Sequence, residues 1–322
     1  MKNNYFSFSL FAGLLFLAFA ASAKPFSDLV IFGGSLSDTG NFASVTGDLP
    51  PPYYKNRVSN GPVATDVLAA WFGFEAKASL HLIGPPVGNN FGMNGALASR
   101  KGPIDLTAQM DAYFNSKNNS ADPDALYILL IGGNDVFEAM LEPDEFKAEK
   151  IVRDAVEGTE EAFHRLVGAG AKTILAANFF DLGIVPAARI NGVSEKATRL
   201  SRLFNHLTRK MFDRVERHLD FQLIRFDFNG VIKDLLKNAD ELNFTNSTDA
   251  CLDLIDKGEC DFEHFAFFNQ YLPTARVHSL LGNAMTFAIL HRNTKQSSYH
   301  KEGRGRNRKL EFFQWEDEKE VN

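Results

Sequence analysis

Several features are scarce in this sequence, and each scarcity argues against a class of protein. Only two of the 322 residues are cysteine, and no paired histidine accompanies them, which argues against a metal site. Positive charge is not in excess, because the formal net charge is −6, and this argues against general nucleic-acid binding. Beyond the N-terminal residues, no segment is long and apolar enough to span a bilayer. We therefore expect no metal, no cofactor, no nucleic-acid partner and no membrane span in the mature chain.

The N-terminus has the pattern of a secretory signal. Lys2 supplies a positive charge, residues 6–20 form an apolar run, and Ala21-Ser22-Ala23 has the small residues of a cleavage site. The run is short for a spanning helix, although an uncleaved membrane anchor is the alternative. We expect residues 1–23 to be a signal peptide and the mature protein to be exported, to the periplasm or the extracellular space.

Export gives the two cysteines a meaning. Cys251 and Cys260 are close in sequence, and in an oxidising compartment a local disulfide is expected; two free thiols are the alternative. After residue 291 the apolar period is lost, and the chain becomes first basic and then acidic. We expect residues 24–291 to form one domain and residues 292–322 to be a disordered charged tail, with an interaction tail as the alternative.

Within the expected domain, short apolar runs alternate with longer helical patterns. The runs are residues 28–33, 125–131, 171–177 and 221–226, and the helical patterns are residues 63–71, 145–167, 194–219 and 273–290. This alternation predicts an α/β protein with a parallel sheet between two helix layers. Ser35 and Asn134 each follow a predicted strand, so both should lie at the carboxyl edge of the sheet, where such proteins bind ligands.

Several short motifs occur in order along the chain. They are Phe32-Gly33-Gly34-Ser35-Leu36-Ser37-Asp38-Thr39-Gly40-Asn41, Asn56-Arg57-Val58-Ser59-Asn60-Gly61-Pro62, Asn90-Phe91-Gly92-Met93-Asn94-Gly95-Ala96, Gly132-Gly133-Asn134-Asp135, Asn178 to Pro186, and Phe204-Asn205. In this set and order they resemble the GDSL lipases, also called SGNH hydrolases, over roughly residues 28–288. The resemblance implies a three-layer α/β/α fold of flavodoxin-like architecture. It also implies an ester hydrolase whose ligand is an ester, a lipid or a glycan.

The resemblance also implies residue roles. Ser35 matches the nucleophile, and its own N–H, the N–H of Gly95 and the side-chain amide of Asn134 match the three oxyanion donors. These roles fit the chemistry of acyl transfer, which needs neutral, preorganised donors aimed at the developing charge on a carbonyl oxygen. Asp135 is expected to be structural and to fix the Asn134 loop.

Three positions depart from the family pattern. Gly34 stands where the family has Asp. Phe267 to His278 aligns without a gap on the family's Phe-Trp-Asp-x-x-His-Pro-Thr-x-x-x-His, so that Asn269 replaces the acid and Leu272 replaces the base. Leucine can accept no proton, and asparagine could not stabilise an imidazolium. We therefore expect an impaired or inactive member of the family, with the Leu272 side chain facing Ser35 and Asn269 behind it.

Two alternatives remain open. Asp261-Phe262-Glu263-His264 has the Asp-x-x-His spacing, so the chain could be an active esterase whose base has moved to His264. It could also be a non-catalytic binding or envelope protein in which the pocket has no role. His278 matches a second family histidine and is expected to point away from Ser35.

Overall fold

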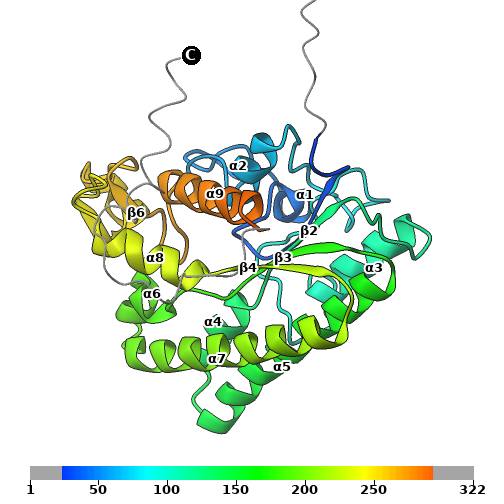
Figure 1. The fold of residues 1–322 in the computed structure, drawn as a ribbon. Coiled ribbons are helices and arrows are strands. Elements are labelled where there is room, and N and C mark those ends of the chain that lie inside the picture. Colours follow the sequence, from blue (N-terminus) through cyan, green and yellow to red (C-terminus); the bar gives the residue numbers. More distant parts are fainter. Residues whose placement is uncertain (1–23, 293–322) are drawn as a thin grey trace, which may run out of the picture.

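The computed structural model describes residues 24–292. The expected signal peptide (1–23) and nearly all of the charged tail (292–322) lie outside the described residues, so both stay predictions. The described chain is an α/β protein with a central parallel sheet between helix layers, which confirms the fold expected from the sequence (Figure 1).

Four parallel strands form the central sheet, and they are hydrogen-bonded in the order β1-β2-β3-β4. The strands are β1 (Leu29–Gly33), β2 (Leu126–Leu130), β3 (Thr173–Ala177) and β4 (Gln222–Phe226). Every residue of β1 and β2 is buried. Strands covered on both faces need continuous apolar runs, which is the pattern the sequence shows at all four strands.

A further extended segment lies beside β1 on the side away from β2. The N–H of Ile31 donates to Asn89 O at 2.9 Å, and the N–H of Phe91 donates to Ile31 O at 2.7 Å, as in a parallel ladder. The chain therefore leaves β1 toward one side of the sheet and returns to pair β2 on the other side. Such a reversal of strand order is where open α/β sheets bind ligands.

Helices cover both faces of the sheet (Figure 1). α2 (Ala64–Trp71) and α9 (Ala275–Leu290) pack against each other on one face; α4 (Gly133–Leu141), α5 (Glu145–Gly168) and α7 (Ser194–His218) pack together on the other. The remaining helices are α1 (Asn41–Thr46), α3 (Leu106–Ser116), α6 (Pro186–Ile190) and α8 (Phe228–Lys237), with a 3-10 turn η1 (Leu182–Ile184). The four helices predicted from the sequence correspond to α2, α5, α7 and α9.

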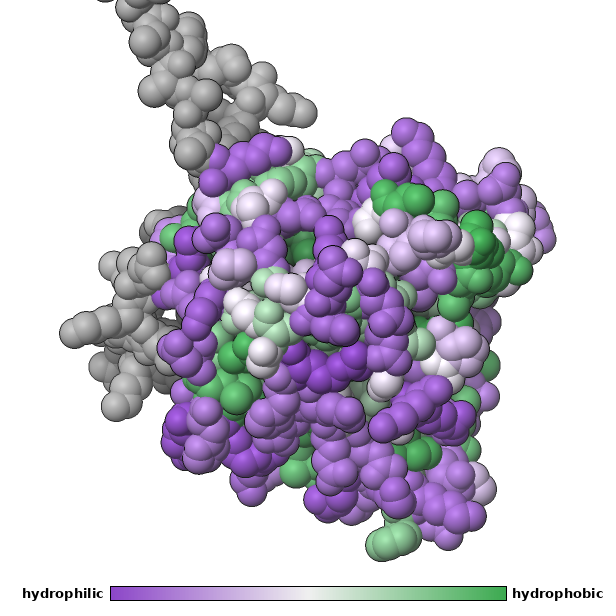
Figure 2. Space-filling model, turned by 90° about the vertical axis from the view of Figure 1, so that its right-hand side faces the viewer, coloured by the Kyte–Doolittle hydropathy of each residue, from purple (hydrophilic) through white to green (hydrophobic). Residues whose placement is uncertain are grey.

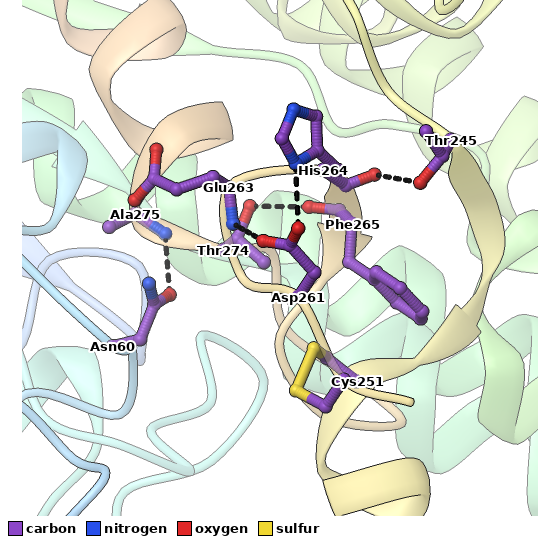
Figure 3. Close-up of a disulfide and its surroundings, with 10 residues drawn as sticks. Asn60, Thr245, Cys251, Asp261, Glu263, His264, Phe265, Thr274 and Ala275 are labelled. Carbon is purple, nitrogen blue, oxygen red and sulfur yellow. Dashed lines mark hydrogen bonds and ion pairs between the residues drawn. A yellow bond between two sulfur atoms is a disulfide. The ribbon is translucent and has the colours of Figure 1, made fainter. Parts of the chain in front are cut away.

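A small second sheet precedes α9. It pairs β5 (Asn246–Ala250) with β6 (Phe265–Phe267), and the 3-10 helix η2 (Cys251–Lys257) lies between them. A disulfide joins Cys251 to Cys260 and closes the loop around η2 (Figure 3). The sequence patterns that revealed the central strands were absent here, because β5 is polar and β6 is very short.

The face of the molecule drawn in Figure 2 is mostly polar. Figure 2 shows a face on which hydrophilic residues predominate and hydrophobic residues gather in a few small patches. Within residues 24–292, none of the helices is long and apolar enough to cross a membrane.

The N-termini of α2 and α9 are capped reciprocally: His278 of α9 caps α2, and Asn60, in the loop that precedes α2, caps α9. The N–H of Ala64, the first residue of α2, donates to His278 Nδ1 at 3.1 Å, and the N–H of Ala275, the first residue of α9, donates to Asn60 Oδ1 at 2.8 Å. These bonds satisfy N–H groups that a helix cannot satisfy internally. His278 is 1% exposed, and burial lowers its pKa to about 3. His278 is thus a neutral structural acceptor.

We predict that His278 makes the fold sensitive to acid. Its pKa is about 3 in the folded chain, against an ordinary value of 6.5. The stability that the neutral ring contributes is therefore complete above pH 6.5 and is lost as the pH falls toward 3. Between pH 7 and pH 4 the free energy of unfolding should fall by about 3 kcal/mol from this group alone. Urea unfolding of the wild type and of His278→Asn at both pH values measures this loss, because Asn keeps an acceptor but does not titrate.

Buried Asp38 and Asp135 are common to both proteins in this comparison, so their own titrations cancel. Equal losses of stability in the wild type and in His278→Asn would contradict the prediction.

Candidate active site

Three strand ends lie side by side at the carboxyl edge of the sheet. Gly33 of β1 is in register with Leu130 of β2, and the N–H of Met93 donates to Gly33 O at 2.9 Å. Ser35, Gly95 and Asn134 follow these three ends within a few residues. The sheet therefore brings together three segments that are far apart in the sequence.

The turn that carries Ser35 is fixed tightly at its start. Gln109 of α3 bonds Gly33 from both sides: the N–H of Gly33 donates to Oε1, and Nε2 donates to Gly33 O, each at 3.0 Å. A Cβ at Gly33 would lie 2.4 Å from Leu130 O, so only glycine fits there. Ser37 closes the turn, because its N–H and its hydroxyl both donate to Gly34 O. No sequence signal pointed to Gln109.

Asp38 joins the serine loop to the glycine segment. Its buried carboxylate accepts hydrogen bonds from the N–H groups of Gly40, Asn41 and Phe42 and, across the site, of Asn94 at 2.8 Å. Burial raises the pKa of Asp38, and the four N–H donors oppose that rise. Gly95 therefore follows directly after a residue whose backbone is bound to the loop of Ser35.

Asn134 lies between these two segments. Its Nδ2 donates to Ala96 O at 2.8 Å, and a Cβ built on Gly34 would lie 3.1 Å from the same nitrogen. Its amide is thus close to the residue before Ser35 and to the residue after Gly95. The neighbouring Asp135 is buried and accepts hydrogen bonds from the N–H groups of Ala98 and Ser99. Its role is structural, but it fixes helix α4, which contains Asn134, and not a loop.

Two N–H groups at this edge are free to bind a ligand. Among residues 24–292, no hydrogen bond involves the backbone N–H of Ser35 or that of Gly95. These two N–H groups and the amide of Asn134 are neutral donors on segments that follow three neighbouring strand ends. Such a set can hold the oxygen of a carbonyl group. Gly95 has φ +84°, a backbone conformation that favours glycine.

The turn with Asn269 and Leu272 follows β6. Asn269 Oδ1 accepts hydrogen bonds from the N–H groups of Tyr271 and Leu272, at 2.9 and 2.8 Å, so this oxygen is occupied within its own turn. The half-buried Leu272 side chain packs against the hydrophobic core. The Tyr271 ring packs on Phe137 of α4, with ring centroids 4.8 Å apart, one helical turn after Asn134. This contact places the turn beside the helix that carries Asn134.

The structure contains the Asp261–His264 pair of the alternative reading. His264 Nδ1 and Asp261 Oδ2 are 2.8 Å apart, and the two side chains are 42% and 59% exposed (Figure 3). The hydrogen bond with His264 is the main reason that the pKa of Asp261 is lowered. His264 precedes β6 and Phe268 follows it, so at roughly 3.3 Å per residue they are about 13 Å apart. The pair lies at the opposite end of β6 from Asn269 and Leu272.

Within the described residues, no imidazole is hydrogen-bonded to Ser35. Ser35 is 8% exposed, and none of the hydrogen bonds formed within residues 24–292 involves its Oγ. His278 is bound instead to the N–H of Ala64. The orientation of Leu272 toward Ser35 stays a prediction.

No cluster of three or more His, Cys, Asp or Glu side chains that could hold a metal ion occurs in the described part of the chain.

Comparison with known proteins gives the same family as the motifs. The chain is 31% identical over 236 residues to a phosphatidylcholine-sterol acyltransferase of Aeromonas hydrophila, an alignment that covers 72% of this chain and 68% of that protein. It is 29% identical over 184 residues to lipase 1 of Photorhabdus luminescens, which covers 56% of this chain but only 26% of the lipase. The chain thus matches about a quarter of that longer protein.

Among solved structures, a catalytic mutant of an acetylxylan esterase from Geobacillus stearothermophilus superposes with a TM-score of 0.45 at 11% identity, covering 82% of this chain and 93% of the esterase. The sequence profile described as GDSL-like Lipase/Acylhydrolase matches residues 29–285. The chain belongs to the GDSL-like lipase/acylhydrolase family.

Proposed function

We propose that this protein is an exported member of the family that binds an ester in the Ser35 site but hydrolyses it very slowly or not at all. The observation that carries the proposal is a contrast within one site. Within residues 24–292 the N–H groups of Ser35 and Gly95 form no hydrogen bond, and the amide of Asn134 lies beside both segments, which supports binding of a carbonyl oxygen. The turn that should supply acid and base instead holds Asn269 and Leu272.

Neither replacement can do the missing chemistry. A serine hydroxyl is a weak nucleophile until a base accepts its proton, and Leu272 has no group that can do so. Asn269 carries no charge, and its Oδ1 is already bound to two backbone N–H groups. Losing a triad serine or histidine lowers turnover on the order of a million-fold. Oxyanion donors and binding alone leave roughly a thousand- to ten-thousand-fold acceleration over water.

The surroundings of the site favour a neutral ligand group. All three candidate donors are uncharged, while the carboxyl groups of Asp38, in the loop after Ser35, and of Asp135, in α4, are buried. An anion placed there would meet two nearby carboxylates, whereas an ester carbonyl brings no net charge. The related acyltransferase and lipase are named for acyl-bearing lipids, so we propose a lipid-like or other small ester as the ligand.

The main rival is an active esterase that uses His264. The Asp261–His264 pair has the hydrogen bond that orients a catalytic histidine. However, it is held at the far end of β6, where the N–H groups of Thr245 and Asn246 bond to His264 O.

Export also remains part of the proposal; it is supported by the signal-like N-terminus and by the Cys251–Cys260 disulfide.

The first prediction concerns the wild type. Purified protein should hydrolyse short-chain p-nitrophenyl esters barely above the buffer rate, because no base activates Ser35. Ser35→Ala and His264→Ala should then leave this rate nearly unchanged. Steady-state turnover of the three proteins is the measurement. Brisk turnover that is abolished by both substitutions would show that the protein is an active esterase with His264 as its base, and would contradict the proposal that it is impaired.

The second prediction is a gain of activity. Asn269→Asp with Leu272→His should raise ester hydrolysis by at least about a hundredfold, because a positioned base activates the serine and the acid fixes its tautomer. Each single change should do much less, since triad members act as a unit. Initial rates on the same ester measure the effect.

The matched control is Asn269→Asp with Leu272→Asn, which adds a polar group of similar reach but no base. Adding Ser35→Ala to the Asp/His variant should remove the gained activity. Gained activity that survives Ser35→Ala would show that the nucleophile has been misassigned.

A further inference from the structure

The motif that begins at Asn56 takes no part in the chemistry above, yet it forms a rigid segment. We call residues 57–66 the strut. Arg57 Nε and Nη2 donate to the two carboxylate oxygens of Asp66 at 3.0 and 2.8 Å, and the N–H of Val63 donates to Asp66 Oδ2 at 3.0 Å. The Arg57 and Asp66 side chains are each only 16% exposed. A bidentate, partly buried ion pair of this kind fixes both ends of the strut relative to each other.

One side of the strut reaches the nucleophile loop. Thr65 Oγ1 donates to Ser37 O at 3.3 Å, and neither residue is exposed at all. Ser37 is two residues from Ser35 and closes its turn through Gly34 O. A displacement of the strut would therefore be felt at the serine turn.

The other side reaches the segment that follows Leu272. The N–H of Ala275 donates to Asn60 Oδ1 at 2.8 Å, and Ser59 Oγ donates to Pro273 O at 3.4 Å (Figure 3 shows the Asn60 bond). A Cβ on Gly61 would lie 2.6 Å from the Cβ of Ala275, so the close approach depends on glycine. The strut therefore bonds to the loop of Ser35 on one side and, on the other, to the segment that directly follows Leu272.

We propose that the strut sets the spacing between Ser35 and positions 269 and 272, and that Asn60 is a positioning residue of this site. Pro273 has a fixed φ, so a shift of Ala275 is passed to Leu272 with little slack. Without the Asn60 oxygen, the first N–H of α9 loses its partner and the start of the helix is free to move. The inference rests on the proposed function, because it assigns positions 269 and 272 to the acid and the base.

The first test uses the Asn269→Asp, Leu272→His protein as background. Adding Asn60→Ala should lower kcat by on the order of tenfold to a hundredfold, as small misplacements of catalytic groups do, while KM changes less than twofold. Asn60→Asp keeps the acceptor oxygen and should restore kcat. The matched control is Asp144→Ala, which also removes a helix cap: Asp144 Oδ1 accepts from the N–H of Lys147 at 3.0 Å at the start of α5.

Asp144→Ala should lower thermal stability about as much as Asn60→Ala and leave kcat unchanged. An equal fall in kcat in the two alanine variants would overturn the positioning role.

A second measurement tests the strut separately from the proposed function, because hydrogen exchange can be measured in a protein that has no activity. Amide hydrogen exchange in the wild-type background follows Phe268, whose N–H donates to Leu272 O at 2.9 Å, and Leu272, whose N–H donates to Asn269 Oδ1. Neither amide is bonded to Asn60. Both should exchange at least tenfold faster in Asn60→Ala, return to the wild-type rate in Asn60→Asp, and stay unchanged in Asp144→Ala.

The two inferences can therefore fail separately. If the Asn269→Asp, Leu272→His protein is inactive, the proposed function loses support, and the positioning role of the strut is then tested by the exchange comparison alone. That role would be overturned if the amides of Phe268 and Leu272 exchanged at the same rate in Asn60→Ala and Asp144→Ala.

Discussion

The candidate site depends on one buried carboxylate. Asp38 accepts hydrogen bonds from three N–H groups that follow Ser35 closely in the sequence and from a fourth, that of Asn94. Asn94 is 56 residues further along the chain than Asp38. Desolvating a carboxylate is costly unless donors surround it, and here the backbone supplies them. Because these donors come from two segments, satisfying the charge also brings the two segments together. The segments that carry Ser35 and Gly95 are joined for a reason that has no direct connection with catalysis.

Much of this arrangement could be predicted from the sequence. The central strands are visible as apolar runs because they are buried on both faces, and the long helices are visible through their periodicity. The resemblance to the family located Ser35, Gly95 and Asn134, and Ser35 and Asn134 each follow a predicted strand. Parallel pairing brings the carboxyl ends of such strands to one edge of the sheet.

The rest depended on contacts that leave no local pattern. The N–H of Ala275 is capped by Asn60 from 215 residues away, and Gln109 holds Gly33 from a helix that the sequence did not reveal. The occupation of Asn269 Oδ1 by its own turn also requires the backbone path after β6. In each case a polar group was visible in the sequence, but its partner was set by packing between distant elements.

The same contacts explain how Asn269 and Leu272 are accommodated in this fold. Asparagine accepts turn N–H bonds as well as aspartate does, so Asn269 keeps the turn after β6 closed. Leu272 packs against the core, where a leucine is no worse for stability than a histidine would be. Among the described residues, neither Asn269 nor Leu272 leaves a buried side-chain nitrogen or oxygen atom without a hydrogen-bond partner. Functional groups are often a burden on stability, and their loss is tolerated easily.

An intact scaffold is consequently no measure of activity in this family. The strut, the mutual caps of α2 and α9 and the Asp38 network all satisfy buried polar groups, and they would be retained for stability whether or not an ester is ever hydrolysed. What the scaffold does determine is the geometry into which a base would be placed. A site that is held by contacts independent of its catalytic groups can lose those groups singly and still present the same donors to a ligand. The distinction between enzyme and binding protein then depends on the two side chains at positions 269 and 272.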